Sequence, residues 1–148
     1  MSEHVFKSHN KSLLLYHLVC PAKYRKRVFS KSVESTLREV CEKIEIAHEI
    51  FFIEIGNDND HIHFLIQSVP SLAPSKIAQI VKGVTSREIQ KKHEEIKLFL
   101  WGGAIWTSGF YINTVGQYAS EDVIINYVKN QGREGQYKKI HSNQLKLF

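Results

Sequence analysis

The chain has 148 residues, 43% of them hydrophobic and 24% charged, which suits one domain with a buried core and excludes a wholly disordered chain. No apolar run approaches the ~18 residues that span a bilayer, and the first residues lack the basic-then-apolar order of a secretory signal. Two cysteines, Cys20 and Cys41, cannot form a disulfide framework, so we expect a cytoplasmic protein with no membrane partner.

The first half of the chain predicts three strands and a helix. Residues 1–10 are polar and are expected to form a frayed tail, whereas residues 12–19 form a compact apolar run typical of a buried strand. A helical stripe of apolar residues from Val33 to Ala47 follows, with Ser30 or Ser32 as its cap. Strands are predicted at 51–55 and 61–69, joined by a turn over 57–60.

The second half predicts two more helices around a last strand. Pro74 is well placed to start an amphipathic helix, in which Gly83 is expected to allow a close approach or a kink. Residues 99–115 are predicted to form a last strand or hairpin, and a final helix follows Ser120 and ends at Gly132. The order of elements favours an α+β fold with a ferredoxin-like antiparallel sheet, two helices on one face and an extra C-terminal helix. We expect one domain over 1–148, with 1–10 and 133–148 as peripheral tails.

Basic residues outnumber acidic ones by twenty to fifteen, giving a net charge of +5, which makes a polyanionic partner plausible without requiring one. One cluster lies around Tyr24, and a second lies in the last twenty residues. A solvated surface is the ordinary explanation of either cluster alone. The basic residues are Lys23, Arg25, Lys26 and Arg27 in the first cluster, and Lys129, Arg133, Lys138, Lys139 and Lys146 in the second.

The most distinctive local pattern is His61-Ile62-His63. Side chains alternate along a strand, so the two imidazoles are expected on one face, away from the core helices, while Ile62 points into the core. Two such imidazoles form half of a metal site. Eight histidines predict roughly 0.4 His-x-His pairs by chance, so two half-exposed strand histidines are the simple alternative.

A metal bound there needs a further ligand from elsewhere. Asp60 is adjacent but is expected on the other face, and Glu54 lies on the neighbouring strand. In the final helix, Tyr127 and Gln131 are four residues apart and share one face, which can place a phenol nucleophile beside an amide ligand. Core packing for Tyr127 and a polar helix end for Gln131 are the ordinary alternatives.

Six segments in order match one family of enzymes. They are Tyr16-His17-Leu18-Val19 with Lys23-Tyr24-Arg25, His61-Ile62-His63, Lys82-Gly83 with Thr85-Ser86-Arg87, Trp101-Gly102, Thr114-Val115-Gly116, and Tyr127-Val128 followed by Gln131. Together they resemble, over nearly the whole chain, the single-tyrosine HUH transposases of minimal insertion sequences, in which U is a hydrophobic residue.

This resemblance implies a ferredoxin-like or RNA-recognition-like fold, a homodimer, and cleavage and rejoining of single-stranded DNA with recognition of subterminal hairpins. It also implies that Mg²⁺ or Mn²⁺ is held by His61, His63 and Gln131. Tyr127 would attack from a helix docked on the partner subunit, with Gly116 at the joint, and form a 5′-phosphotyrosine. The DNA-binding residues expected on this basis and from charge are Lys23, Tyr24, Arg25, Arg27, Lys82, Arg87, Arg133, Lys138 and Lys139.

Three other classes of protein share parts of this pattern. Another HUH nuclease, a replication initiator or a relaxase, commonly carries additional domains, and relaxases often show a third histidine. A non-catalytic RNA- or single-stranded-DNA-binding module needs aromatic platforms on its central strands, where this chain has His61 and His63. A two-histidine phosphoesterase needs two His-x-Ser/Thr motifs, which the sequence lacks.

Overall fold

The computed structural model describes residues 4–100 and 103–116 of the chain. The predicted final helix, with Tyr127 and Gln131, lies outside the described residues, as do the basic residues Arg133, Lys138 and Lys139. The described part contains two small layers of secondary structure that together position the His61-x-His63 pair.

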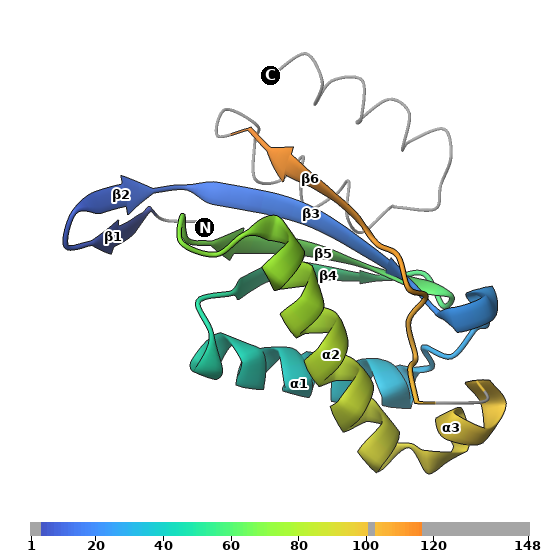
Figure 1. The fold of residues 1–148 in the computed structure, drawn as a ribbon. Coiled ribbons are helices and arrows are strands. Elements are labelled where there is room, and N and C mark those ends of the chain that lie inside the picture. The colour runs from blue at the N-terminus through green and yellow to red at the C-terminus, as the bar shows by residue number, and fades with distance from the viewer. Residues whose placement is uncertain (1–3, 101–102, 117–148) are drawn as a thin grey trace.

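A four-stranded antiparallel sheet forms one layer, with strand order β4-β5-β3-β6 (Figure 1). The strands are β3 (Leu14–Pro21), β4 (Phe51–Asn57), β5 (His61–Ser68) and β6 (Tyr111–Val115). The two central strands are β3 and β5, and His63 lies opposite Val19 in their register. This order confirms the predicted ferredoxin-like sheet.

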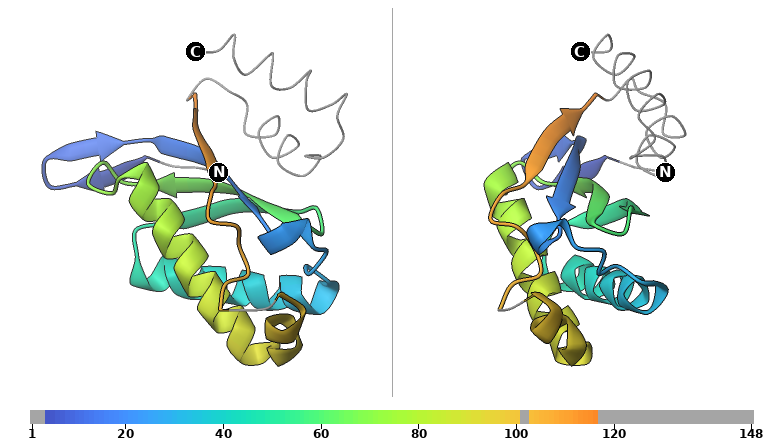
Figure 2. Two further views of the ribbon diagram at one scale, coloured as in Figure 1. Left: turned by 45° about the vertical axis from the view of Figure 1, so that its right-hand side comes forward. Right: turned by 90° about the vertical axis from the view of Figure 1, so that its right-hand side faces the viewer.

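Helices α1 (Lys31–Ala47) and α2 (Pro74–Lys92) pack on the same face of the sheet, as the two views in Figure 2 show. Helix α1 begins after Ser30, whose Oγ accepts a hydrogen bond from the Val33 amide at 3.3 Å, so the first of the two predicted caps is the one used. Pro74 is the first residue of α2, as predicted.

The core lies between this face of the sheet and the two helices. Ile62, Phe64 and Ile66 of β5 are fully buried in it, because alternate residues of a strand share a face. Leu18 of β3 and Leu37 of α1 pack in the same cluster. The strand residues between these positions therefore face the opposite side of the sheet, and that side carries His61 and His63.

The structure departs from the sequence predictions at two places. Strands β1 (Val5–Lys7) and β2 (Asn10–Ser12) pair as a hairpin where a frayed tail was expected, held by backbone pairing, with Phe6 71% exposed. Residues Glu94–Leu100 form helix α3, in which Ile96 and Leu100, four residues apart, are both buried. The last strand therefore does not begin at residue 99 as predicted, and β6 begins at Tyr111.

Two further observations complete the fold. Helix α2 continues through Gly83, and a Cβ there would meet no atom within 4 Å, so the predicted close approach is wrong. Among the described residues, no helix combines the length and the apolar character needed to cross a membrane.

Candidate functional site

The candidate site lies where the β4–β5 turn leads into β5. His61 and His63 project from the same face of β5, with ring centroids 4.7 Å apart, while Ile62 is buried in the core on the other face. This confirms the predicted orientation of the pair. His63 is only 3% exposed, so the alternative of two half-exposed histidines is wrong for this residue.

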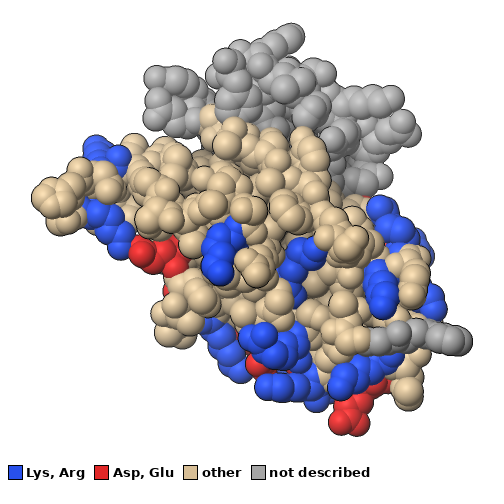
Figure 3. Space-filling view, viewed as in Figure 1, with Lys and Arg blue, Asp and Glu red and all other residues tan. Residues whose placement is uncertain are grey.

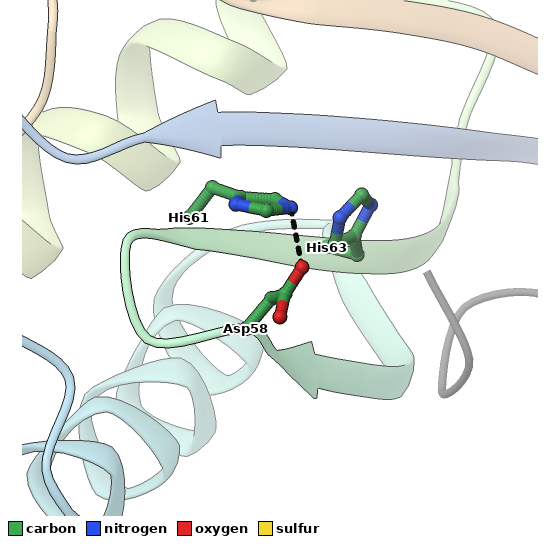
Figure 4. A group of neighbouring side chains, drawn as sticks. All are labelled: Asp58, His61 and His63. Carbon is green, nitrogen blue, oxygen red and sulfur yellow. Dashed lines mark ion pairs between the residues drawn. The ribbon is translucent and has the colours of Figure 1, made fainter. Parts of the chain in front are cut away.

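A carboxylate from the turn completes a cluster with the two imidazoles. Figure 4 shows Asp58 pointing toward His61, whose Nε2 lies 3.0 Å from the Asp58 Oδ2. One possible ligand atom from each of Asp58, His61 and His63 lies within 4.8 Å of the other two. Three protein ligands on two short segments can hold one cation.

The local sequence explains why Asp58 folds back over the strand. Asn59 adopts a left-handed conformation with φ of 62°, and the Oδ1 of Asn57 accepts a hydrogen bond from its amide at 2.8 Å. The sequence predicts a turn here and does not single out Asp58 as a candidate ligand. The available signal was a carboxylate three residues before the first histidine, inside a tight turn.

A second carboxylate holds the His61 ring from its other side. The Oδ1 of Asp60 lies 2.5 Å from the His61 Nδ1, and the Nε of Arg25 donates to Asp60 Oδ2 at 3.4 Å. Burial acts to raise the pKa of Asp60, but His61 and Arg25 outweigh it, and the pKa is lowered overall. Asp60 therefore orients His61, and neither Asp60 nor Glu54 joins the cluster found among the described residues.

Both nitrogens of His61 thus face carboxylate oxygens, which only accept hydrogen bonds. The separation of 3.0 Å between His61 Nε2 and Asp58 Oδ2 is that of a hydrogen-bonded pair, and the same two atoms are close enough to contact one cation.

His63 is held by a third histidine. Its Nδ1 lies 3.0 Å from the Nε2 of His17, a residue of β3 that is 1% exposed. The buried Nε2 of His63 has no hydrogen-bond partner among residues 4–100 and 103–116. Burial, then the nearby His17 and His61, lower the pKa of His63 to about 2, which keeps its ring neutral. A neutral, buried and unpartnered imidazole nitrogen is suited to a cation.

The first basic cluster borders this site. Residues Lys23–Arg25 form the short helix η1, in which Tyr24 and Arg25 both have positive φ, 60° and 54°. The segment is anchored by backbone bonds from the Ala22 amide to the Asp60 carbonyl (2.7 Å) and from the Lys23 amide to the Ile105 carbonyl (2.8 Å). Left-handed backbone at two consecutive non-glycine residues is costly, and here it leaves Tyr24 63% exposed, with the Lys23 Nζ 5.3 Å from its ring.

A second cationic surface lies along α2. Lys82 and Arg87 line a groove of about 710 Å³ together with Lys91 and with Lys97 of α3, and Figure 3 shows Lys and Arg side chains gathered over these helices. Lys82 Nζ also donates to the Ser108 and Gly109 carbonyls at 3.2 and 3.0 Å. The groove therefore offers several cationic groups on one face of the molecule.

Trp106 forms part of the groove wall but is a packing residue. It is 4% exposed, its ring stacks on Phe29 at 5.1 Å, and its Nε1 donates to Thr85 Oγ1 at 2.9 Å. Trp106 is therefore a core residue. Tyr111 is 49% exposed, as a residue that stacks on bases would be.

Comparison with known proteins decides the family. Residues 10–131 match the family described as "Transposase IS200 like". The chain belongs to the IS200-like transposases. It is 28% identical over 118 residues to the ISDra2 transposase TnpA of Deinococcus radiodurans, covering 80% of this chain and 84% of that protein. It is 29% identical over 123 residues to the transposase for insertion sequence element IS200 of Salmonella typhimurium, covering 80% and 77%.

Two solved structures share the fold of this IS200-like chain. A crystal structure of a transposase candidate from Deinococcus radiodurans has a TM-score of 0.70 at 20% identity and covers 95% of this chain and 97% of its own. A REP-associated tyrosine transposase bound to a REP hairpin has a TM-score of 0.56 at 13% identity and covers 91% and 74%.

These findings confirm the resemblance to single-tyrosine HUH transposases and the assignment as an enzyme of DNA transposition. They favour it over a replication initiator, a relaxase, a phosphoesterase and a non-catalytic binding module. The predicted roles of individual residues stay predictions.

Proposed function

We propose that this IS200-like transposase cleaves and rejoins single-stranded DNA at a divalent-cation centre built on His61 and His63. Gln131 supplies a further ligand, and Tyr127 is the nucleophile that forms a 5′-phosphotyrosine. The observation that carries the proposal is the convergence of Asp58, His61 and His63, whose possible ligand atoms lie within 4.8 Å of one another.

The donor set supports Mg²⁺ or Mn²⁺. Carboxylate and amide oxygens are the ligands that hard cations prefer, and imidazole nitrogen is compatible with Mn²⁺ as well as with softer ions. Asp58 adds an oxygen to the His61, His63 and Gln131 set that the family resemblance implies. The buried, unpartnered Nε2 of His63 is a position where a cation would relieve an unsatisfied polar atom.

The proposed chemistry follows from the residue types. The cation would neutralise charge on the scissile phosphate and orient it. The Tyr127 hydroxyl attacks phosphorus, the 3′-oxygen leaves as a hydroxyl, and the phosphoryl group stays bonded to the tyrosine. A 3′-hydroxyl from another DNA end later attacks that bond and releases the phenol. A phenol with pKa ~10 is a better leaving group than a serine hydroxyl, which keeps the second step accessible without ATP.

The two basic surfaces are suited to binding the DNA. Lys82 and Arg87 of the α2 groove would contact phosphates, since a groove lined by several cationic side chains can bind along a nucleic-acid backbone. Around η1, Lys23, Arg25 and Arg27 would contact phosphates while the exposed Tyr24 stacks on a base. Hairpin-ended single-stranded DNA is the proposed substrate. Arg133, Lys138 and Lys139 belong to the same proposal from the sequence alone.

We propose a homodimer on a separate observation. Among the described strands, β6 pairs with β3 alone and lies at the edge of the sheet, where Phe110 and Tyr111 are 41% and 49% exposed. An exposed edge with aromatic side chains is a template for pairing with another chain. Light scattering coupled to size-exclusion chromatography should give twice the monomer mass.

The decisive experiment searches for a covalent adduct. The full chain is incubated with Mg²⁺ or Mn²⁺ and single-stranded DNA carrying the element ends, then resolved on a denaturing gel. We expect a protein–DNA adduct that disappears with EDTA and in Tyr127→Phe, while hairpin binding persists. Tyr111→Phe is the matched control, because it removes a phenol hydroxyl elsewhere and should leave the adduct. If Tyr127→Phe formed as much adduct as the unsubstituted protein, the nucleophile would be another residue.

A further inference from the structure

The two histidines of the proposed cation centre are held in the same way by different residues. The Nδ1 of His61 is hydrogen-bonded to Asp60, and the Nδ1 of His63 is hydrogen-bonded to His17. We propose that His17 is a positioning residue for this centre: its Nε2 accepts the hydrogen of His63 Nδ1, which fixes His63 in the tautomer whose Nε2 lone pair is free for the cation. The inference rests on the proposed function of His63 as a ligand.

The sheet register places His17 on the far side of His63 from the other ligands. His17 lies opposite Leu65, and His63 lies opposite Val19, so His17 approaches from the downstream side of β5, whereas His61 and Asp58 lie upstream. The centroids of the His17 and His63 rings are 5.2 Å apart and the ring planes are inclined by 20°, so the two rings are nearly parallel. With Nδ1 held from downstream, Nε2 is directed upstream, and Figure 4 shows a ring nitrogen of His63 on the side of His61 and Asp58.

The direction of this hydrogen bond decides whether His63 can bind a cation. A neutral imidazole carries one hydrogen, so a hydrogen bond donated by His17 would leave that hydrogen on His63 Nε2 and block the lone pair. A hydrogen bond donated by His63 Nδ1 leaves the Nε2 lone pair free, with the hydrogen of the neutral His17 ring on its Nδ1.

Burial gives this hydrogen bond its importance. His17 and His63 are 1% and 3% exposed, so water does not compete for either nitrogen that they share. A neutral imidazole has two tautomers, and the hydrogen bond between these two buried rings selects one of them. Groups that hold a ligating histidine at its second nitrogen set its orientation and basicity, and their loss typically lowers metal affinity by about 10- to 100-fold.

The first test needs no cation. In protein labelled with ¹⁵N-histidine, two- and three-bond ¹H–¹⁵N correlations report which ring nitrogen carries the hydrogen. The His63 signals are assigned by their absence from the spectrum of His63→Gln. In the metal-free protein we expect His63 to be the Nδ1–H tautomer. A His63 found as the Nε2–H tautomer would overturn the proposal. Free histidine favours the Nε2–H form, so the expected result is not the default.

The second test compares three replacements of His17 by their Mn²⁺ affinity, measured with Mn²⁺ alone by electron paramagnetic resonance. In His17→Gln the amide oxygen reaches the place of Nε2 and can accept the hydrogen bond, so affinity should stay close to that of the unsubstituted protein. His17→Asn is too short and His17→Phe has no acceptor, so affinity should fall by about 10- to 100-fold in both. His48→Phe, an exposed histidine after α1, is the control for loss of an imidazole.

The outcomes separate this proposal from a general loss of structure. Equal weakening by His17→Gln and His17→Asn, or unchanged affinity in His17→Phe, would overturn the role of the accepted hydrogen bond. If His17→Phe fails to fold, as thermal denaturation would show, the Gln and Asn pair still decides the question. Absence of Mn²⁺ binding by the unsubstituted protein would refute the proposed cation centre, whereas the tautomer measurement tests the His17 contact independently of it.

Discussion

Replacing the buried His63 by glutamine should flatten the pH dependence of stability below neutrality. In the folded chain the pKa of His63 is lowered from 6.5 to about 2, chiefly by burial, so the ring stays neutral throughout the accessible acid range. In the unfolded chain it takes up a proton as the pH falls through 6.5. The unfolded state then binds more protons, and the free energy of unfolding decreases as the pH falls.

The size of this effect follows from the two pKa values. One unit below 6.5, the unfolded imidazole is about nine-tenths protonated while the folded one is neutral, and integration from pH 7.5 to 5.5 gives a loss of about 1.4 kcal/mol. Glutamine does not titrate, so His63→Gln should lack this loss whatever its effect on stability at neutral pH. The expected result is therefore a difference in slope.

Urea denaturation followed by tryptophan fluorescence, in EDTA at pH 7.5, 6.5 and 5.5, measures the slope. The other histidines are common to both proteins, so their contributions cancel to first order. His48→Gln, which removes an exposed imidazole, should run parallel to the unsubstituted protein. Parallel curves for His63→Gln and the unsubstituted protein would refute the assignment of His63 as a neutral, desolvated ring.

Three further predictions concern the site and its surroundings. Asp58→Ala removes the carboxylate that faces His61 and should weaken Mn²⁺ binding by at least about tenfold, measured by calorimetry; unchanged affinity would exclude Asp58 as a ligand. Arg87→Ala should weaken hairpin binding and reduce the slope of log K against log salt concentration by about 1. An unchanged slope would show that Arg87 is a solvated surface residue that does not contact a phosphate. Tyr24→Gly should relieve left-handed backbone strain and raise the free energy of unfolding by about 1 kcal/mol while weakening single-stranded DNA binding; a loss of stability would contradict the strain argument.

The sheet and the histidine pair were predictable because both depend on periodicity. Alternation along residues 61–66 placed Ile62, Phe64 and Ile66 in the core and the two imidazoles on the opposite face, and the structure confirms that arrangement. The β1–β2 hairpin was not predictable in this way, because its pairing uses backbone groups and leaves Phe6 exposed. The seven-residue α3 was missed since its two buried residues, Ile96 and Leu100, span a single turn of helix.

The candidate site was predictable only in part. The role of Asp58 depends on a left-handed residue at Asn59, a conformation that a run of Asn and Asp permits without specifying. The contact between His17 and His63 depends on strand order, which brings together residues 46 positions apart. Tyr127 and Gln131 were identified by family resemblance, lie outside the described residues, and stay predictions.

The backbone at the end of β3 has a mechanical consequence. The Ala22 amide is bonded to the turn that carries Asp58 and Asp60, and the neighbouring Lys23 amide is bonded to Ile105, next to the wall of the α2 groove. Two consecutive amides thus bind the turn that carries Asp58 and the groove wall to the end of one strand, where Ala22 is fully buried. Because both parts are bonded to the same short segment, a larger side chain at Ala22 should displace both of them.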